Sequence, residues 1–153
     1  MIYVASSWRN PYYLGILDCL DQWAIEYYNW RDEEGFHWSE VFGTESVDHW
    51  TEPIPPHKFV EAMQHHRAIS GFERDMQHLR EADAVVLLLP CGKSAHLEAG
   101  WAVGAGKPVA LYTGHESLQP ELMYGMFNVI LDDITELMHW CKLQTRLPKR
   151  VTT

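Results

Sequence analysis

Short apolar runs alternate with helical stretches along most of this chain. Runs typical of β-strands lie at residues 2–5, 23–28, 84–89, 108–112 and 127–131. Apolar residues recur at helical spacing within residues 12–22, 57–67, 71–82, 94–106, 120–126 and 132–144. The run AVVLLL at 84–89 is apolar throughout, which is typical of a central strand buried on both faces. The alternation therefore predicts a three-layer α/β fold around a parallel sheet of about five strands.

Residues 29–56 interrupt this alternation. They form a long polar segment with Gly35, Gly43 and three prolines, which we interpret as a loop with at most one short helix. Loops of this length are uncommon in compact domains and are often functional. Since 153 residues suit one hydrophobic core, we expect residues 1–153 to form a single domain of the flavodoxin-like or Rossmann-like kind.

The charge balance restricts the partners that the chain can bind. Its formal net charge is −9 and it has no basic run, which argues against binding to a nucleic-acid polymer or to an anionic membrane. We therefore expect a small-molecule partner. The three cysteines follow no disulfide or metal-binding spacing, and the N-terminal residues do not look like a signal peptide. These features favour a cytoplasmic location.

The stretch PCGKSAHLE, residues 90–98, matches parts of three known active-site motifs. The GKS at 92–94 resembles the end of a phosphate-binding P-loop, but Leu87 occupies the position of the first glycine of that motif. The HLE at 96–98 matches part of a zinc deaminase motif, but no P-C-x-x-C follows it. Cys91 lacks the nearby arginine of a phosphatase loop, so we interpret it as a packed residue. We therefore expect neither a metal nor a cofactor.

Two carboxylates are the strongest candidates for catalysis. Glu98 lies one position beyond the capping-box glutamate of a helix that Ser94 would cap, and the plain alternative is a glutamate favoured by the helix dipole. Asp75 lies in the helix before the central strand. The rise per residue along the two helices and the strand between them places both carboxylates near the carboxyl edge of the sheet. In open parallel sheets, ligands bind at this edge. A pair of carboxylates is the usual equipment for cleaving a glycosidic bond.

Four segments, which span most of the chain, carry a resemblance to a known family. They are IYVASSWRN (2–10), GFERDMQHLREADAVVLLLP (71–90), SAHLEAGWAVGAGKPVALY (94–112) and PELMYGMFNVILDDITEL (120–137). Within them, E-x-G-x-A-x-x-x-x-K-P and R-D-x-x-x-L-x-x-A-D are the most specific patterns. Together the segments resemble the nucleoside 2-deoxyribosyltransferase superfamily, which includes the deoxynucleoside 5′-monophosphate N-glycosidases.

The resemblance implies a role for several residues. Glu98 would be the nucleophile, Asp75 the acid that helps the base to leave, and Tyr3 a hydroxyl that steadies Glu98. The sequence departs from the family pattern six residues before Glu98, where relatives have Asp or Ser and this chain has glycine. Six residues are candidates for substrate binding. Ser7 and Arg9 lie in the first loop, with Trp8 between them as an aromatic lid. Gly92 and Ser94 lie at the departure from the family pattern, and His96 is a candidate phosphate contact.

The expected function is cleavage or transfer at the N-glycosidic bond of a 2′-deoxynucleoside or its monophosphate, through a covalent glycosyl-glutamate intermediate. The sequence leaves transfer and hydrolysis open. Two other functions also stay open: a nucleotide-binding or sensing module of the same fold without turnover, and an NAD glycohydrolase. Members of this superfamily commonly form dimers or larger assemblies, so the resemblance implies a homo-oligomer, in which the segment 113–128 could close the pocket.

Overall fold

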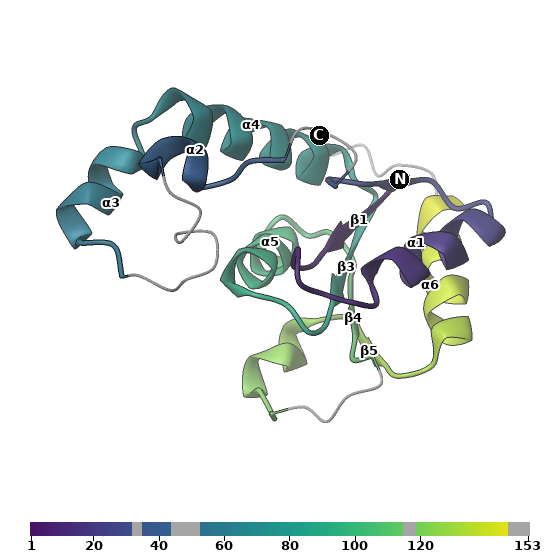
Figure 1. Cartoon of the computed structure of the whole chain (residues 1–153). Helices are drawn as coiled ribbons and strands as arrows, with labels where there is room; N and C mark the ends of the chain where they lie inside the picture. The colour runs from purple at the N-terminus through teal and green to yellow at the C-terminus, as the bar shows by residue number, and fades with distance from the viewer. Residues whose placement is uncertain (32–34, 44–52, 115–118, 147–153) are drawn as a thin grey trace. The chain divides into compact units, whose positions relative to one another are not determined.

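The computed structural model describes residues 1–31, 35–43, 53–114 and 119–146, and it confirms the parallel α/β fold (Figure 1). Five parallel strands form one sheet in the order β2-β1-β3-β4-β5. These strands are β1 (Ile2–Ala5), β2 (Tyr27–Tyr28), β3 (Ala84–Leu88), β4 (Val109–Tyr112) and β5 (Val129–Leu131). As the continuous apolar run predicted, β3 occupies the centre of the sheet and every one of its residues is buried.

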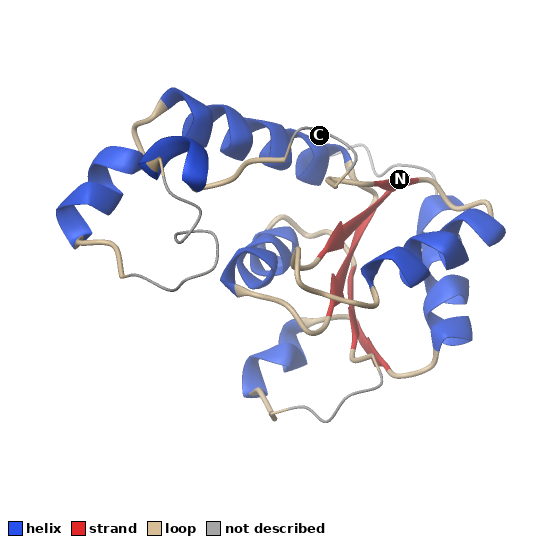
Figure 2. Cartoon of the chain, in the orientation of Figure 1, coloured by secondary structure: helices blue, strands red, loops and turns tan. Residues whose placement is uncertain are grey.

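Helices cover both faces of this sheet, which gives the three expected layers. Figure 2 shows α5 (Lys93–Gly104) on one face, and α1 (Tyr13–Gln22) with α6 (Ile134–Arg146) on the other. Buried leucine, isoleucine and tyrosine side chains of α1 and buried residues of α6 such as Leu137 pack against the sheet. Between β4 and β5 lies a short 3-10 helix, η2 (Leu122–Met126).

The backbone divides into two compact units, Met1–Asn29 with Leu79–Thr153, and Trp30–His78. The first unit holds the sheet. The second holds α2 (Ser39–Phe42), α3 (Pro56–Ala62) and most of α4 (His66–Glu81). The expectation of a single domain stays a prediction. The short helix expected within 29–56 is α2, while residues 32–34 and 44–52 lie outside the described residues.

The sequence placed the break between α3 and α4 too late. The predicted helices end at 67 and begin again at 71, whereas α4 begins at His66 and runs through Gly71. A Cβ atom at position 71 would lie 2.9 Å from the Cβ of Phe36, so the glycine makes room for that ring instead of ending a helix. The His65 Nδ1 accepts a hydrogen bond of 3.3 Å from the Arg67 N–H and so helps to begin α4.

Strand β2 is also shorter than the predicted run at 23–28. Residues 23–25 instead close the end of α1: the Trp23 N–H donates to the Cys19 carbonyl, and the Ile25 N–H donates to the Leu20 carbonyl. Ala24 adopts a left-handed conformation with φ of 49°. Apolar residues that end a helix thus look like part of a strand in the sequence.

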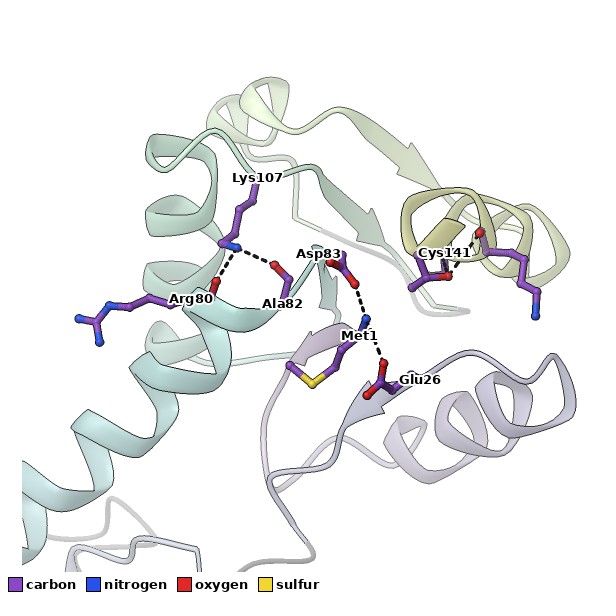
Figure 3. A network of polar contacts seen from close by, with 9 residues as sticks. Met1, Glu26, Arg80, Ala82, Asp83, Lys107 and Cys141 are labelled. Carbon is purple, nitrogen blue, oxygen red and sulfur yellow. Dashed lines mark hydrogen bonds and ion pairs between the residues drawn. The ribbon is translucent and has the colours of Figure 1, made fainter. Parts of the chain in front are cut away.

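A network of polar contacts lies at the amino edge of the sheet (Figure 3). The Lys107 Nζ donates to the carbonyl of Arg80 at 2.8 Å and to that of Ala82 at 2.5 Å. The Met1 ammonium contacts the carboxylate of Asp83 and lies 3.5 Å from that of Glu26. The lysine of the K-P pattern therefore joins the end of α4 to the turn before β4. Lys107 thus has a structural role at the amino edge, which is the opposite end of the strands from the carboxyl edge.

Candidate active site

The candidate site lies at the carboxyl edge of the sheet, between β1 and β3. From β1 the chain continues to β2 on one side, and from β3 it continues to β4 on the other. The connections that follow β1 and β3 therefore leave the sheet in different directions. In open parallel sheets this switch point is where ligands bind.

The loop after β1 contains three of the predicted substrate-binding residues. Ser7 is half-buried, while Trp8 is 46% exposed and Arg9 is exposed. The Ser7 Oγ accepts a 3.2 Å hydrogen bond from the Arg9 N–H, and the Ser7 carbonyl accepts one of 3.0 Å from the Asn10 N–H. These bonds form a tight turn that places Trp8 and Arg9 at the surface, directly beyond the end of β1.

The connection from β3 to α5 differs from the prediction in its cap. Gly92, in an extended conformation, is the N-cap, so the helix begins at Lys93, and Ser94 is an exposed residue of the first turn. The premise that Ser94 caps this helix is therefore wrong. Glu98 becomes the sixth residue of α5, beyond the first turn in which the helix dipole favours acidic side chains. A favourable interaction with the helix dipole therefore explains Glu98 poorly.

The rotation of α5 determines which side Glu98 faces. Ala95, Ala99 and Ala102 are at most 1% exposed and form the stripe that packs on β3, β1 and β4. At 100° per residue, His96 and Glu98 flank this stripe on opposite sides. His96 faces η2, where its Nε2 lies 3.0 Å from the hydroxyl of Tyr124. Glu98 therefore faces the β1 side of the helix, toward the switch point.

Tyr3 lies on the same face of the sheet as α5. In the register of the strands it is level with Tyr28 and Val85, and its ring centroid lies 5.7 Å from that of Tyr28. Tyr112 belongs to the opposite face, toward α1. Burial raises the pKa of its hydroxyl, and the charges of Asp133 and of Cys19, a residue of α1, raise it further, which places the hydroxyl near α1. Residues level with one another across parallel strands share a face, and successive residues of a strand alternate between faces. Tyr3 is level with Val85 and Tyr112 is level with Leu88, so Tyr3 lies on the face opposite to Tyr112. This is the face that α5 covers, and Tyr3 and Glu98 therefore lie on one side of the sheet.

Cys91 lies against His96, with its Sγ 3.6 Å from the His96 Nδ1, and it also feels the charge of Glu98. Burial raises the pKa of Cys91 from 9.0 to about 12, and the negative charge of Glu98 contributes to the rise. Because the reactive form of cysteine is the thiolate, a raised pKa leaves very little of Cys91 in its nucleophilic form at neutral pH. This agrees with the interpretation of Cys91 as a packed residue, and it places the charge of Glu98 near the β3–α5 connection.

His96 uses both ring nitrogens within the protein. Its Nδ1 lies 2.8 Å from the Gly92 carbonyl, which can only accept, so Nδ1 carries the proton. In the neutral ring, Nε2 then accepts from the Tyr124 hydroxyl, and the two rings stack with centroids 5.8 Å apart. The role of His96 as a phosphate contact stays a prediction.

Two of the cavities lined by described residues border the sheet unit. One, of about 570 Å³, lies at the start of α5 and is lined by Cys91, Gly92, Lys93, His96 and Leu97. The other, of about 610 Å³, lies at the amino edge, where Asp83 and Lys142 are among its lining residues. Only the first borders the carboxyl edge, where ligands bind in such sheets. It brings Gly92 and His96 together, whereas Glu98 lies on the other side of α5.

Asp75 lies on α4 within the second unit. Its side chain is 39% exposed, and its Oδ1 lies 3.8 Å from the Arg74 Nε. Because Glu98 belongs to the first unit, the expected pairing of these two carboxylates stays a prediction. Among the described residues, no three His, Cys, Asp or Glu side chains form a group that could hold a metal ion. Nor does any helix within the described ranges have the length and apolar character needed to cross a bilayer.

Sequence reasoning missed Ser6 and Asn10 in the loop after β1. Asn10 is only 3% exposed, and no other polar or charged residue among those described is as buried. Its amide contacts Ser6 and the last carbonyl of β3. The available signal was its place in SSWRN directly after a buried strand, but nothing in the sequence distinguishes a buried asparagine there from an exposed one.

A comparison with a solved structure supports this architecture. No family model matches the chain, and no curated protein matches its sequence. A 2-deoxyribosyltransferase from Bacillus psychrosaccharolyticus superposes with a TM-score of 0.55 at 15% identity, over 90% of this chain and 89% of that one. A CMP N-glycosidase from Clostridium botulinum, BcmB, matches with a TM-score of 0.45 at 16% identity, over 92% and 97%. The resemblance seen in the sequence is thus confirmed for the fold: this chain has the fold of a 2-deoxyribosyltransferase.

Proposed function

We propose that this protein cleaves or transfers the N-glycosidic bond of a 2′-deoxynucleoside or its monophosphate, with Glu98 as the nucleophile. The observation that carries the proposal is the position of Glu98. It lies beyond the first turn of α5, on the side that faces β1, above the face of the sheet that holds Tyr3. The fold shared with a 2-deoxyribosyltransferase supports the same chemistry.

The proposed reaction is a double displacement at C1′ of the sugar. The Glu98 carboxylate attacks C1′ while the bond to the base breaks, and an acid supplies the proton that the leaving base takes up. Water or a second base then attacks C1′, gives up its proton to the conjugate base of that acid, and releases Glu98 as a carboxylate. Two inversions give net retention of configuration. The neutral thiol of Cys91 adds no second negative charge beside the nucleophile.

The proposal is tested by following release of free base chromatographically. The protein is incubated with each common deoxynucleoside, each monophosphate and NAD, with and without a second base as acceptor. We expect base release from at least one deoxynucleoside or monophosphate, and a fall of about 10³-fold or more in Glu98→Gln. The matched control is Glu136→Gln, which changes an exposed glutamate of α6. A new nucleoside in the acceptor mixture identifies transfer.

Three results would contradict the proposal. The first is no base release from any deoxynucleoside or monophosphate, with the ligands recovered intact even where calorimetry detects binding; this result identifies a binding module. The second is release of nicotinamide from NAD alone. The third is full activity in Glu98→Gln.

We propose Asp75 as the acid that protonates the leaving base. Asp75→Asn should then slow release of natural bases, yet have little effect on 4-nitrophenyl 2-deoxyriboside, whose leaving group needs no proton. Glu73→Gln, an exposed change on the same helix, is the matched control. If Asp75→Asn slows all substrates equally, another group is the acid.

A further inference from the structure

The carboxyl end of β3 is tied to the loop after β1 by side chains. Strand β1 ends at Ala5, level with Leu87, so the Leu88 carbonyl lies beyond the last backbone pairing between these strands. Two side-chain donors take the place of that pairing. The Ser6 Oγ donates to the Leu88 carbonyl at 3.1 Å, and the Asn10 Nδ2 donates to the same oxygen at 3.3 Å. A buried carbonyl without such donors would cost free energy.

The Asn10 side chain also closes its own loop. Its Nδ2 donates to the Ser6 Oγ at 3.0 Å, and its Oδ1 accepts from the Tyr12 N–H at 2.8 Å. One amide group thus contacts the start of the loop, the segment entering α1 and the end of β3. Asn10 is only 3% exposed, and its bond to the Leu88 carbonyl is buried, where a hydrogen bond is electrostatically stronger than in water.

We propose that Asn10 is a positioning residue for the reaction, which holds the substrate-facing loop at Ser7, Trp8 and Arg9 in register with the β3–α5 connection. The inference rests on the proposed function, because it assigns that loop to the substrate side. The chain from Leu88 continues through Cys91 and Gly92 into the helix that carries Glu98. Asn10 therefore connects the two walls of the switch point, one with the candidate sugar contacts and the other with the nucleophile.

The test replaces the amide by an isosteric carboxylate. In Asn10→Asp the ionised side chain faces the Leu88 carbonyl with an acceptor in place of a donor, so the loop should move. We expect kcat/KM to fall about 10²-fold, the cost of misplacing bound groups by about 1 Å, with part of the loss in kcat. Asn128→Asp is the matched control, since its Oδ1 can still accept the 2.8 Å hydrogen bond from the Val109 N–H.

A second readout follows the loop without using activity. In protein labelled with 5-fluorotryptophan, the ¹⁹F signal of Trp8 is assigned with Trp8→Phe. We expect this signal to shift in Asn10→Asp at pH 8 and to return toward the wild-type position at pH 5. Burial beside the Leu88 carbonyl should raise the pKa of the new carboxyl, and the protonated group can donate to that carbonyl again. The signals of the other tryptophans and of Asn128→Asp should stay in place.

Ser6→Ala is the milder variant should Asn10→Asp not fold. It removes one donor to the Leu88 carbonyl and should shift the Trp8 signal less, in the same direction. The inference is overturned if the folded variant keeps wild-type kcat and KM, or if the Trp8 signal of Asn10→Asp and Ser6→Ala matches wild type. If wild-type protein releases no base, the proposed function fails, while the Trp8 signal still decides whether Asn10 holds the loop.

Discussion

At the scale of single residues, the pKa of the Cys91 thiol depends on burial and on the charge of Glu98. A pKa raised to about 12 means that at pH 8 the thiolate fraction is about 10³-fold below that of an ordinary thiol. We predict that iodoacetamide alkylates Cys91 slowly at pH 8 and faster in Glu98→Gln, since loss of the negative charge lowers the pKa of the thiol. Peptide mass spectrometry measures both rates. An unchanged rate in Glu98→Gln, equal to that in the control Glu136→Gln, would place Glu98 away from the β3–α5 connection.

Lys107 is a second residue with one definable task. Its ammonium donates to the carbonyls of Arg80 and Ala82, at the end of α4 and before β3. Lys107→Met removes both bonds, so the free energy of unfolding should fall by roughly 1–2 kcal/mol. Urea denaturation measures this, with the exposed Lys58→Met as the control. Because Lys107 lies at the amino edge, kcat/KM of the folded variant should stay unchanged, and a large loss would assign this lysine to the site.

At the scale of elements, the alanines and the glycines of α5 lie on different sides of the helix, and only the alanines pack against the sheet. The alanines of its stripe touch the sheet, but a Cβ added at Gly100 or Gly104 would meet no atom within 4 Å. Only the alanines are needed for close packing, while the glycines face open space.

This distinction predicts opposite effects of two substitutions. Gly100→Ala should raise the free energy of unfolding by about 0.5–1 kcal/mol, because alanine has the higher helix propensity and meets no obstacle. Ala99→Leu should lower it by about 1–3 kcal/mol through overpacking against the sheet. Thermal and urea unfolding of both variants test this. Destabilisation by Gly100→Ala would mean that something packs against this face of α5.

The sequence predicted element types well and boundaries less well, for physical reasons. The apolar run of β3, bounded by Asp83 and Pro90, is typical of a buried strand, and the sequence patterns of β4 and α6 also indicated the correct element types. The errors fall at element boundaries, where a contact distant in sequence or a cap without a side chain decides. Gly71 continues α4 because Phe36 packs against it, and α5 begins one residue early because Gly92, without a side chain, is its cap.

At the scale of the molecule, the order of the parallel sheet indicates where a ligand site is expected before any side chain is considered. The order β2-β1-β3-β4-β5 puts the switch point between β1 and β3, and Tyr3, the loop at 7–9 and α5 all adjoin it. The sequence could single out Glu98 as a candidate, because this glutamate begins the E-x-G-x-A-x-x-x-x-K-P pattern that carries the family resemblance. It could not name Asn10, whose importance comes from bonds to Ser6 and Leu88 that no spacing reveals.

The measurement that tests the central claim most directly is the intact mass of protein quenched in acid during turnover of a deoxynucleoside or its monophosphate. If Glu98 attacks C1′, a fraction of the wild-type protein gains the mass of one deoxyribosyl group, attached at a peptide that contains Glu98, and Glu98→Gln gains none. A substrate that is turned over while the wild-type protein keeps its unmodified mass, or an adduct that persists in Glu98→Gln, would contradict the account.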